Sequence, residues 1–249
     1  MLAIIGGSGL TQLANLQVMR RKTVRTPYGK PSGALIFGKM QGRAMVFLAR
    51  HGANHTIPPH AVNYRANLWA LHAQKVKEVV SVATVGGIRA GLAPGTLVVP
   101  DQIIDYTHGR RSSYCGARGQ QGVLHIDFTR PYCEALRQRL LGSAAAAGEA
   151  AVDGGTYAAT QGPRLETAAE IDRIERDGGD IVGMTGMPEA ALAREIGLCY
   201  AAIVVVVNHA AGRGTSTQGI RLQDAEAIAK RSMARVLRIL DRLAVSNGD

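Results

Sequence analysis

The sequence predicts an α/β fold with a central mixed, largely parallel sheet flanked by helices. Apolar runs rich in β-branched residues are interspersed with segments of helical periodicity, which is typical of this class. The run 201–207 is almost continuously apolar, as expected for a strand covered on both faces. No repeat of 20–50 residues and no Pro/Ser-rich linker divides the chain, so we expect a single domain over residues 1–249.

The expected elements follow from hydrophobic periodicity and from helix boundary signals. Strands are expected at 2–5, 34–37, 44–49, 78–85, 96–104, 156–159, 181–183 and 200–207. Helices are expected at about 61–74, 131–147, 167–177, 188–196 and 223–244. The helix at 188–196 has the clearest boundaries, because Pro188 suits a first turn, Glu189 suits the positive N-terminal end and Gly197 can end it. Residues 182–185 therefore lie at a strand-to-helix junction, where ligands of open α/β sheets gather.

Composition excludes several classes of protein. The chain is 46% hydrophobic and 19% charged, which supports a sizeable core and argues against disorder. The longest apolar run, 198–207, is about half of what a bilayer requires, so no membrane association is expected. Glycines at 6, 7 and 9 interrupt the apolar N-terminal residues 1–5, and no basic segment precedes them. We therefore expect a cytoplasmic protein.

The net charge of +10, from 29 Lys and Arg against 19 Asp and Glu, favours an anionic partner. The basic residues are scattered, and the two short clusters, 20–22 and Arg110 with Arg111, lie far apart. Aromatic residues make up only 4% of the chain, so a basic surface with interleaved aromatics is not expected. The charge therefore predicts a phosphate-bearing small ligand rather than nucleic acid.

The three cysteines, Cys115, Cys133 and Cys199, are odd in number and far apart in the chain. This spacing predicts neither a disulfide framework nor a zinc site.

Three expected strands end in loops rich in hydrogen-bond donors. The first ends in Gly-Gly-Ser-Gly with Ser8, the second in Arg50 and His51, and the third in Thr84 followed by two glycines. Each loop alone is also compatible with a tight turn or a solvated surface, but together they predict an oxyanion cradle. Position 12 is Gln, so the dinucleotide fingerprint is incomplete, and the P-loop lysine is missing. No carboxylate cluster for a metal accompanies the loops, which favours free phosphate over a magnesium nucleotide.

Two further polar residues have both structural and functional interpretations. Glu166 begins an expected helix, where an acidic residue complements the helix dipole, but it could also accept a hydrogen bond from a ligand. Asn208 ends a very apolar strand and could form a turn, or it could donate to and accept from the edge of a heterocycle.

These segments together resemble the trimeric purine nucleoside phosphorylase family, especially its 5'-methylthioadenosine phosphorylase branch. The resemblance extends from residue 2 to the C-terminal helix. It rests on GGSGL, TPYG, LARHGANHTIPPHAVNYRANLWAL, VGGIRAGLAPGTLVVPDQIID, QGPRLET and GMTGMPEAALAREIGLCYA. The family implies a homotrimer that binds no metal or other cofactor and cleaves a purine ribosyl bond with inorganic phosphate as co-substrate.

The resemblance also implies roles for individual residues. The phosphate set is Ser8, Arg50, His51, Ala83, Thr84 and Thr185, with His55 as a weaker addition. Catalysis is assigned to Asn208 and Glu166, and substrate contacts to these two and to Met184, Leu165, His209, Ala210, Leu222 and His125. Met184 would touch the ribose, and His125 would reach the 5' end of the site in a neighbouring subunit.

Two departures from the methylthioadenosine pattern predict the substrate. Asn208, His209 and Ala210 stand where those enzymes usually have Asp-x-Asp, and an amide with Glu166 suits a 6-oxopurine better than adenine. Enzymes for ordinary nucleosides have a His that meets the 5'-hydroxyl, and here that spacing falls on Leu222, near Ile220. The combination predicts 5'-methylthioinosine. A general inosine/guanosine phosphorylase, a methylthioadenosine phosphorylase, a hydrolytic nucleosidase and a basic nucleic-acid-binding protein are the alternatives.

Overall fold

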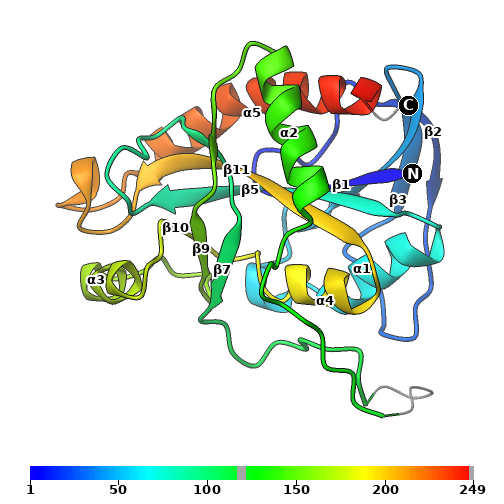
Figure 1. Ribbon diagram of the computed structural model, residues 1–249, viewed down its shortest axis with the longest axis horizontal. Helices are drawn as coiled ribbons and strands as arrows, with labels where there is room; N and C mark the ends of the chain where they lie inside the picture. Colours follow the sequence, from blue (N-terminus) through cyan, green and yellow to red (C-terminus); the bar gives the residue numbers. More distant parts are fainter. Residues whose placement is uncertain (117–121, 247–249) are drawn as a thin grey trace.

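The computed structural model describes residues 1–116 and 122–246, in which eleven strands form one mixed sheet flanked by five α-helices (Figure 1). The strands are β1 (Leu2–Gly6), β2 (Gln17–Lys22), β3 (Leu35–Met40), β4 (Arg43–Ala49), β5 (Glu78–Gly87), β6 (Leu97–Val99), β7 (Gln102–Asp105), β8 (Ala151–Asp153), β9 (Thr156–Ala159), β10 (Ile181–Gly183) and β11 (Cys199–His209). The helices are α1 (Tyr64–Ala73), α2 (Glu134–Ala146), α3 (Ala168–Arg176), α4 (Glu189–Glu195) and α5 (Leu222–Ser246). Within these described ranges, no helix combines the length and apolar character that crossing a membrane requires.

The centre of the sheet is β5, which pairs in parallel with β1 on one side and with β11 on the other. The main path of the sheet runs β2-β3-β4-β1-β5-β10-β9-β7, and β11 leads from β5 to β6 and then β8. Most neighbouring pairs are parallel; the β2–β3, β3–β4, β5–β10 and β6–β11 pairs are antiparallel. This confirms the predicted mixed, largely parallel sheet. The carboxyl ends of β1, β4, β5 and β11 consequently meet at one edge.

Helices cover both faces of the sheet, and each face has its own apolar core (Figure 1). On one face α1 and α4 pack through residues such as Leu68 and Leu192. On the other, α2 and α5 pack through residues such as Leu140 and Leu240. Because both faces are covered, β5 and β11 are buried along almost their whole length, which explains their continuous apolar sequences.

The structure corrects three expectations about the strands. The expected strand 96–104 is two strands, β6 and β7, because Pro100 lacks an amide donor and interrupts the pairing. Strand β2 was not expected because all six of its residues are exposed, as suits the edge of the sheet. Strand β8 was not expected because it has only three residues and none of them is fully buried.

The cysteine expectation is also wrong, since Cys133 and Cys199 form a disulfide. Their separation of 66 residues does not keep them apart, because Cys133 precedes α2 and Cys199 begins the adjacent β11. The Cys133 amide donates to the Tyr200 carbonyl at 2.7 Å, which brings the two Cα atoms to 5.2 Å. Sequence spacing alone could not show this contact between distant segments. Cys115 is the free cysteine.

Candidate active site

A cavity of about 1060 Å³ opens at the strand ends and gathers most of the residues expected to form the site. Its lining includes the whole expected phosphate set, His55 included: Ser8, Arg50, His51, His55, Ala83, Thr84 and Thr185. It also includes Met184, Leu165, Glu166, Asn208, Ala210, Ile220 and Leu222. Residues from six strand ends and from the start of α5 therefore share one space.

The glycine turn after β1 lies directly against Arg50. A Cβ atom on Gly7 would fall 2.8 Å from Arg50 Nη1 and 2.7 Å from the Val82 carbonyl, so only glycine allows this approach. Ser8 follows at the cavity wall, with its Oγ 3.4 Å from His55 Nε2. The turn thus brings the Ser8 hydroxyl and backbone beside the basic residues that follow β4.

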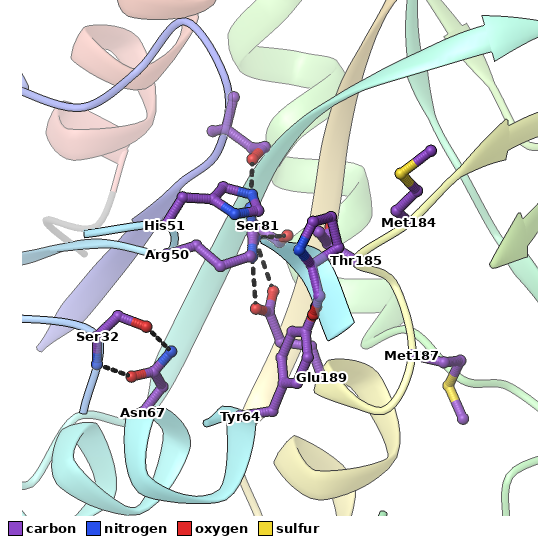
Figure 2. A network of polar contacts seen from close by, with 12 residues as sticks. Ser32, Arg50, His51, Tyr64, Asn67, Ser81, Met184, Thr185, Met187 and Glu189 are labelled. Carbon is purple, nitrogen blue, oxygen red and sulfur yellow. Dashed lines mark hydrogen bonds and ion pairs between the residues drawn. The ribbon is translucent and has the colours of Figure 1, made fainter. Parts of the chain in front are cut away.

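Arg50 is fully buried and forms an ion pair with Glu189, as Figure 2 shows. Its Nε and Nη2 donate to the two carboxylate oxygens at 2.7 and 2.8 Å. Nη2 also donates to Ser81 Oγ and Nη1 donates to the Val82 carbonyl, so one Nη1–H has no acceptor among the described residues, and Arg50 belongs to the cavity lining. Burial disfavours the charge of Arg50, but the Glu189 carboxylate more than offsets this and holds the pKa above its ordinary value.

Glu189 has a role that the sequence did not reveal. The expectation was that it complements the N-terminal end of α4. In the structure it is fully buried and also accepts a hydrogen bond from the Tyr200 hydroxyl at 2.9 Å. It therefore neutralises and orients Arg50, and the 139 residues that separate the pair explain why spacing gave no signal.

His51 is held as a neutral ring. Its Nδ1 lies 2.8 Å from the Ile57 carbonyl, which can only accept, so Nδ1 carries the proton and Nε2 carries a lone pair. Burial, together with the charge of Arg50, lowers the pKa of His51 to about 4. The sequence interpretation treated His51 as a source of donors. At neutral pH its Nε2 instead accepts, which suits the P–OH group of hydrogen phosphate.

Asn208 and Glu166 line the same cavity from β11 and from the loop before α3. The pairing of β11 with β5 shifts register between Val206 and Asn208, an irregularity of the kind that re-aims side chains near sites. Asn208 Nδ2 donates to the His209 carbonyl at 2.7 Å, which leaves its second N–H and its oxygen for a ligand.

Thr160, which sequence reasoning missed, orients Glu166. Its hydroxyl donates to Glu166 Oε1 at 2.6 Å, so Oε2 is the oxygen available to a ligand. Thr160 directly follows β9, and the rule that led to the other strand-end polar residues could have found it.

Met184, expected to touch the ribose, and two exposed leucines also line the cavity. A Cβ atom on Gly162 would lie 2.4 Å from Met184 Sδ, so the loop before Glu166 packs closely on this side chain. Leu165 and Leu222 both line the cavity and are 40% and 66% exposed. On the α5 side, the wall around Leu222 also includes Glu226 and Lys230.

Two expected substrate residues do not line this cavity. His209 directs its Nδ1 to Thr215 Oγ1 at 3.0 Å, its ring lies against Gly214, and it is not among the residues that line this cavity, so its contact with substrate stays a prediction. His125 is exposed and lies outside the cavity wall, and its contribution to a neighbouring subunit stays a prediction.

Comparison with known proteins places this fold and site in one class of enzyme, the phosphorylases. The model of the phosphorylase superfamily matches residues 1–244. A probable S-methyl-5'-thioinosine phosphorylase of Pseudomonas syringae pv. tomato is 52% identical over 94% of this chain and 97% of its own length. A probable 6-oxopurine nucleoside phosphorylase of Thermococcus kodakarensis is 45% identical over 85% of this chain and 80% of its own.

Solved structures agree with this result. The methylthioadenosine phosphorylase of Schistosoma mansoni, in complex with adenine, superposes with a TM-score of 0.94 at 33% identity, over 99% of this chain and 91% of its own. The chain therefore belongs to the phosphorylase superfamily, and its expected fold and family are confirmed.

Proposed function

We propose that this protein converts 5'-methylthioinosine and phosphate into hypoxanthine and 5-methylthioribose 1-phosphate. One observation carries the proposal: Asn208 and Glu166 line the same cavity as the phosphate set, together with Ile220 and Leu222. A 6-oxopurine presents O6 as an acceptor and N1–H as a donor. Asn208 can donate to O6 and accept from a protonated N7, while Glu166 accepts N1–H through Oε2.

The reaction breaks the N9–C1' bond and forms a bond from a phosphate oxygen to C1'. As the glycosidic bond lengthens, the ribose gains oxocarbenium character, and the phosphate anion beside it stabilises that positive charge before it attacks. Arg50 and Ser8 orient the phosphate with the Thr84 and Thr185 hydroxyls, and His51 accepts its P–OH. No side chain of the protein becomes a covalent nucleophile.

The departing base carries the electron pair of the broken bond. Negative charge collects on the purine at N7 and O6, where Asn208 interacts with it more strongly in the transition state than in the ground state. The proton that N7 gains is, in the overall balance, the one that hydrogen phosphate loses as it becomes the dianionic sugar 1-phosphate, so the product is neutral hypoxanthine. The mechanism needs no metal or other cofactor, since phosphate is a co-substrate and supplies the nucleophile.

The relatives support the preference for a 6-oxopurine over adenine more directly than the preference for a 5'-methylthio group over a 5'-hydroxyl. The relatives named above carry names with thioinosine or 6-oxopurine in them, whereas the solved neighbour is a methylthioadenosine phosphorylase. Leu222 and Ile220 favour a methylthio group over a hydroxyl, because one buried methylene contributes about 0.8 kcal/mol. The proposal also includes a homotrimeric assembly, in which segment 122–125 of a neighbouring subunit closes the open apolar end, and a cytoplasmic location.

The test compares 5'-methylthioinosine, inosine and 5'-methylthioadenosine at fixed phosphate, with the liberated base identified by chromatography. We expect the highest kcat/KM for methylthioinosine, hypoxanthine as the product, and no turnover without phosphate. A preference for inosine would indicate a general oxopurine nucleoside phosphorylase, and a preference for methylthioadenosine would contradict the base assignment. Cleavage without phosphate would indicate a hydrolase.

A further inference from the structure

Arg110 lies in the loop that follows β7, and its guanidinium binds the loop that carries Glu166. Its Nη2 donates to the carbonyls of Thr160 and Gln161 at 3.2 and 2.8 Å, and its Nε donates to Gln161 Oε1 at 3.2 Å. Thr160 is the residue whose hydroxyl holds Glu166. We call residues 160–167 the base loop.

The same guanidinium binds a second loop, residues 183–188, which we call the sugar loop. Arg110 Nη1 donates to the carbonyls of Met184 and Met187 at 2.8 and 2.6 Å. Met184 lines the cavity where the ribose is expected, and both methionines are visible in Figure 2. One side chain thus joins the loop that reads the base to the loop that contacts the sugar.

Arg110 has no donor left for a ligand. Its five N–H groups face six acceptors, the five named above and the Tyr64 hydroxyl at 3.4 Å from Nη1, and Arg110 is not among the residues that line the cavity. Its Cζ lies 5.5 Å from the centre of the Tyr64 ring. Four of the six acceptors are backbone carbonyls, so most of the bonds fix main chain rather than mobile side chains.

We propose that Arg110 is a positioning residue, which sets the distance between the base loop and the sugar loop and so places Glu166 relative to Met184. The inference rests on the proposed function, because it assumes that the nucleoside lies between these loops. The planar fork of five donors serves four carbonyls of the two loops and the Gln161 side chain together, whereas the three donors of a lysine ammonium are too few for all of them. Of the phosphate set, Thr185 lies in the sugar loop between Met184 and Met187, while Ser8, Arg50, His51, Ala83 and Thr84 lie on other strand ends.

The test measures steady-state kinetics of Arg110→Met against both substrates. We expect kcat/KM for the nucleoside to fall about 100-fold, since a small misplacement of reacting groups has effects of that size. KM for phosphate should rise by less than about fivefold, because Thr185 is the one member of the phosphate set in the sugar loop and the other members are held independently of Arg110. Arg110→Lys should be intermediate, and added guanidinium chloride at millimolar concentration should partly restore Arg110→Ala.

Arg111→Met is the matched control, because this exposed neighbour loses the same charge, and we expect wild-type kinetics from it. A purely structural role would lower the fraction of active enzyme and leave both KM values unchanged, which would overturn the proposal. An equal fall in kcat/KM for phosphate and for the nucleoside would also overturn it. So would wild-type kinetics with the nucleoside in folded Arg110→Met. If Arg110→Met does not fold, Arg110→Lys is measured instead. A fall in kcat/KM for the nucleoside that exceeds the change for phosphate supports the proposal, and unchanged kinetics contradict it.

The substrate preference of the wild-type protein shows whether the proposed function fails independently of the role of Arg110. If it prefers inosine to methylthioinosine, the proposed substrate is wrong. The Arg110 variants are then measured with inosine. We again expect a large fall in kcat/KM for the nucleoside and a small change in KM for phosphate.

Discussion

The two ends of the cavity are built differently. At the phosphate end, Arg50 and Glu189 are completely buried and His51 is 6% exposed, and all are fixed by hydrogen bonds to strand ends or to neighbouring loops. At the 5' end, Leu165 and Leu222 are 40% and 66% exposed and belong to a loop and to the start of a helix. The anion cradle is part of the core of the fold, whereas the specificity end can change with little effect on folding.

The largest expected effect of a substitution follows from the buried ion pair. Arg50→Met leaves the Glu189 carboxylate buried without its partner, which costs about 3–5 kcal/mol of unfolding free energy. It also removes a donor to phosphate, so kcat/KM for phosphate should fall about 10²- to 10³-fold. Urea denaturation and phosphate kinetics measure the two effects.

The double variant Arg50→Met with Glu189→Met separates stability from activity. Because no unpaired charge is then buried, stability should recover most of the loss while activity does not. As a control, Arg173→Met removes one partner of an exposed pair with Asp177 and should leave the urea midpoint nearly unchanged. Full activity in the double variant would show that Arg50 does not act on phosphate.

The next effect is on the choice of base. Asn208→Asp replaces the amide donor to O6 by a carboxylate, so kcat/KM for methylthioinosine should fall by about 10²-fold or more, while phosphate KM stays unchanged. The kcat/KM for methylthioadenosine should fall less or should rise, because a carboxylate accepts a hydrogen bond from the amino group of adenine. The ratio of kcat/KM values for the two nucleosides is the measurement, and an unchanged ratio would contradict the role of Asn208.

A smaller effect is expected at the exposed 5' end. Leu222→His supplies a hydrogen-bonding partner for a 5'-hydroxyl and removes apolar surface, so the preference for methylthioinosine over inosine should fall about tenfold. Unfolding free energy should change by less than about 0.5 kcal/mol, since the side chain is mostly exposed. Leu222→Met is the apolar control and should retain the preference.

A further effect concerns the pH dependence of stability through His51. Its pKa is lowered to about 4 in the folded protein from an ordinary value of 6.5, so the unfolded chain binds more protons between these values. The contribution of His51 to stability is therefore complete above pH 6.5 and is lost as the pH falls towards 4. Phosphate raises the pKa of the ring beside it, so added phosphate should reduce this loss. Thermal denaturation against pH, with His51→Asn as the variant that removes this part of the slope, measures the effect.

The sequence predicted those parts of the molecule that depend on local pattern. The apolar runs of β5 and β11 reveal buried strands, and the glycine and donor-rich ends of β1, β4 and β5 meet in one cavity, as local pattern predicted. The resemblance to the family then added Met184 and Thr185, which line the cavity as expected.

What the sequence missed depends on contacts between distant segments. The pairing of Glu189 with Arg50, the disulfide of Cys133 and Cys199, and the bonds of Arg110 all join residues that no spacing rule connects. The direction of the His209 side chain, toward Thr215, was also beyond local pattern, because it depends on the irregular register of β11 near its end.

A crystal structure with hypoxanthine and sulfate bound would show directly whether one cavity holds both the anion and the 6-oxopurine. We expect sulfate against Arg50, Ser8 and Thr84, and the purine between Asn208 and Glu166 with its O6 near the amide nitrogen. Sulfate and base in separate cavities, or Asn208 and Glu166 turned away from the purine, would contradict it.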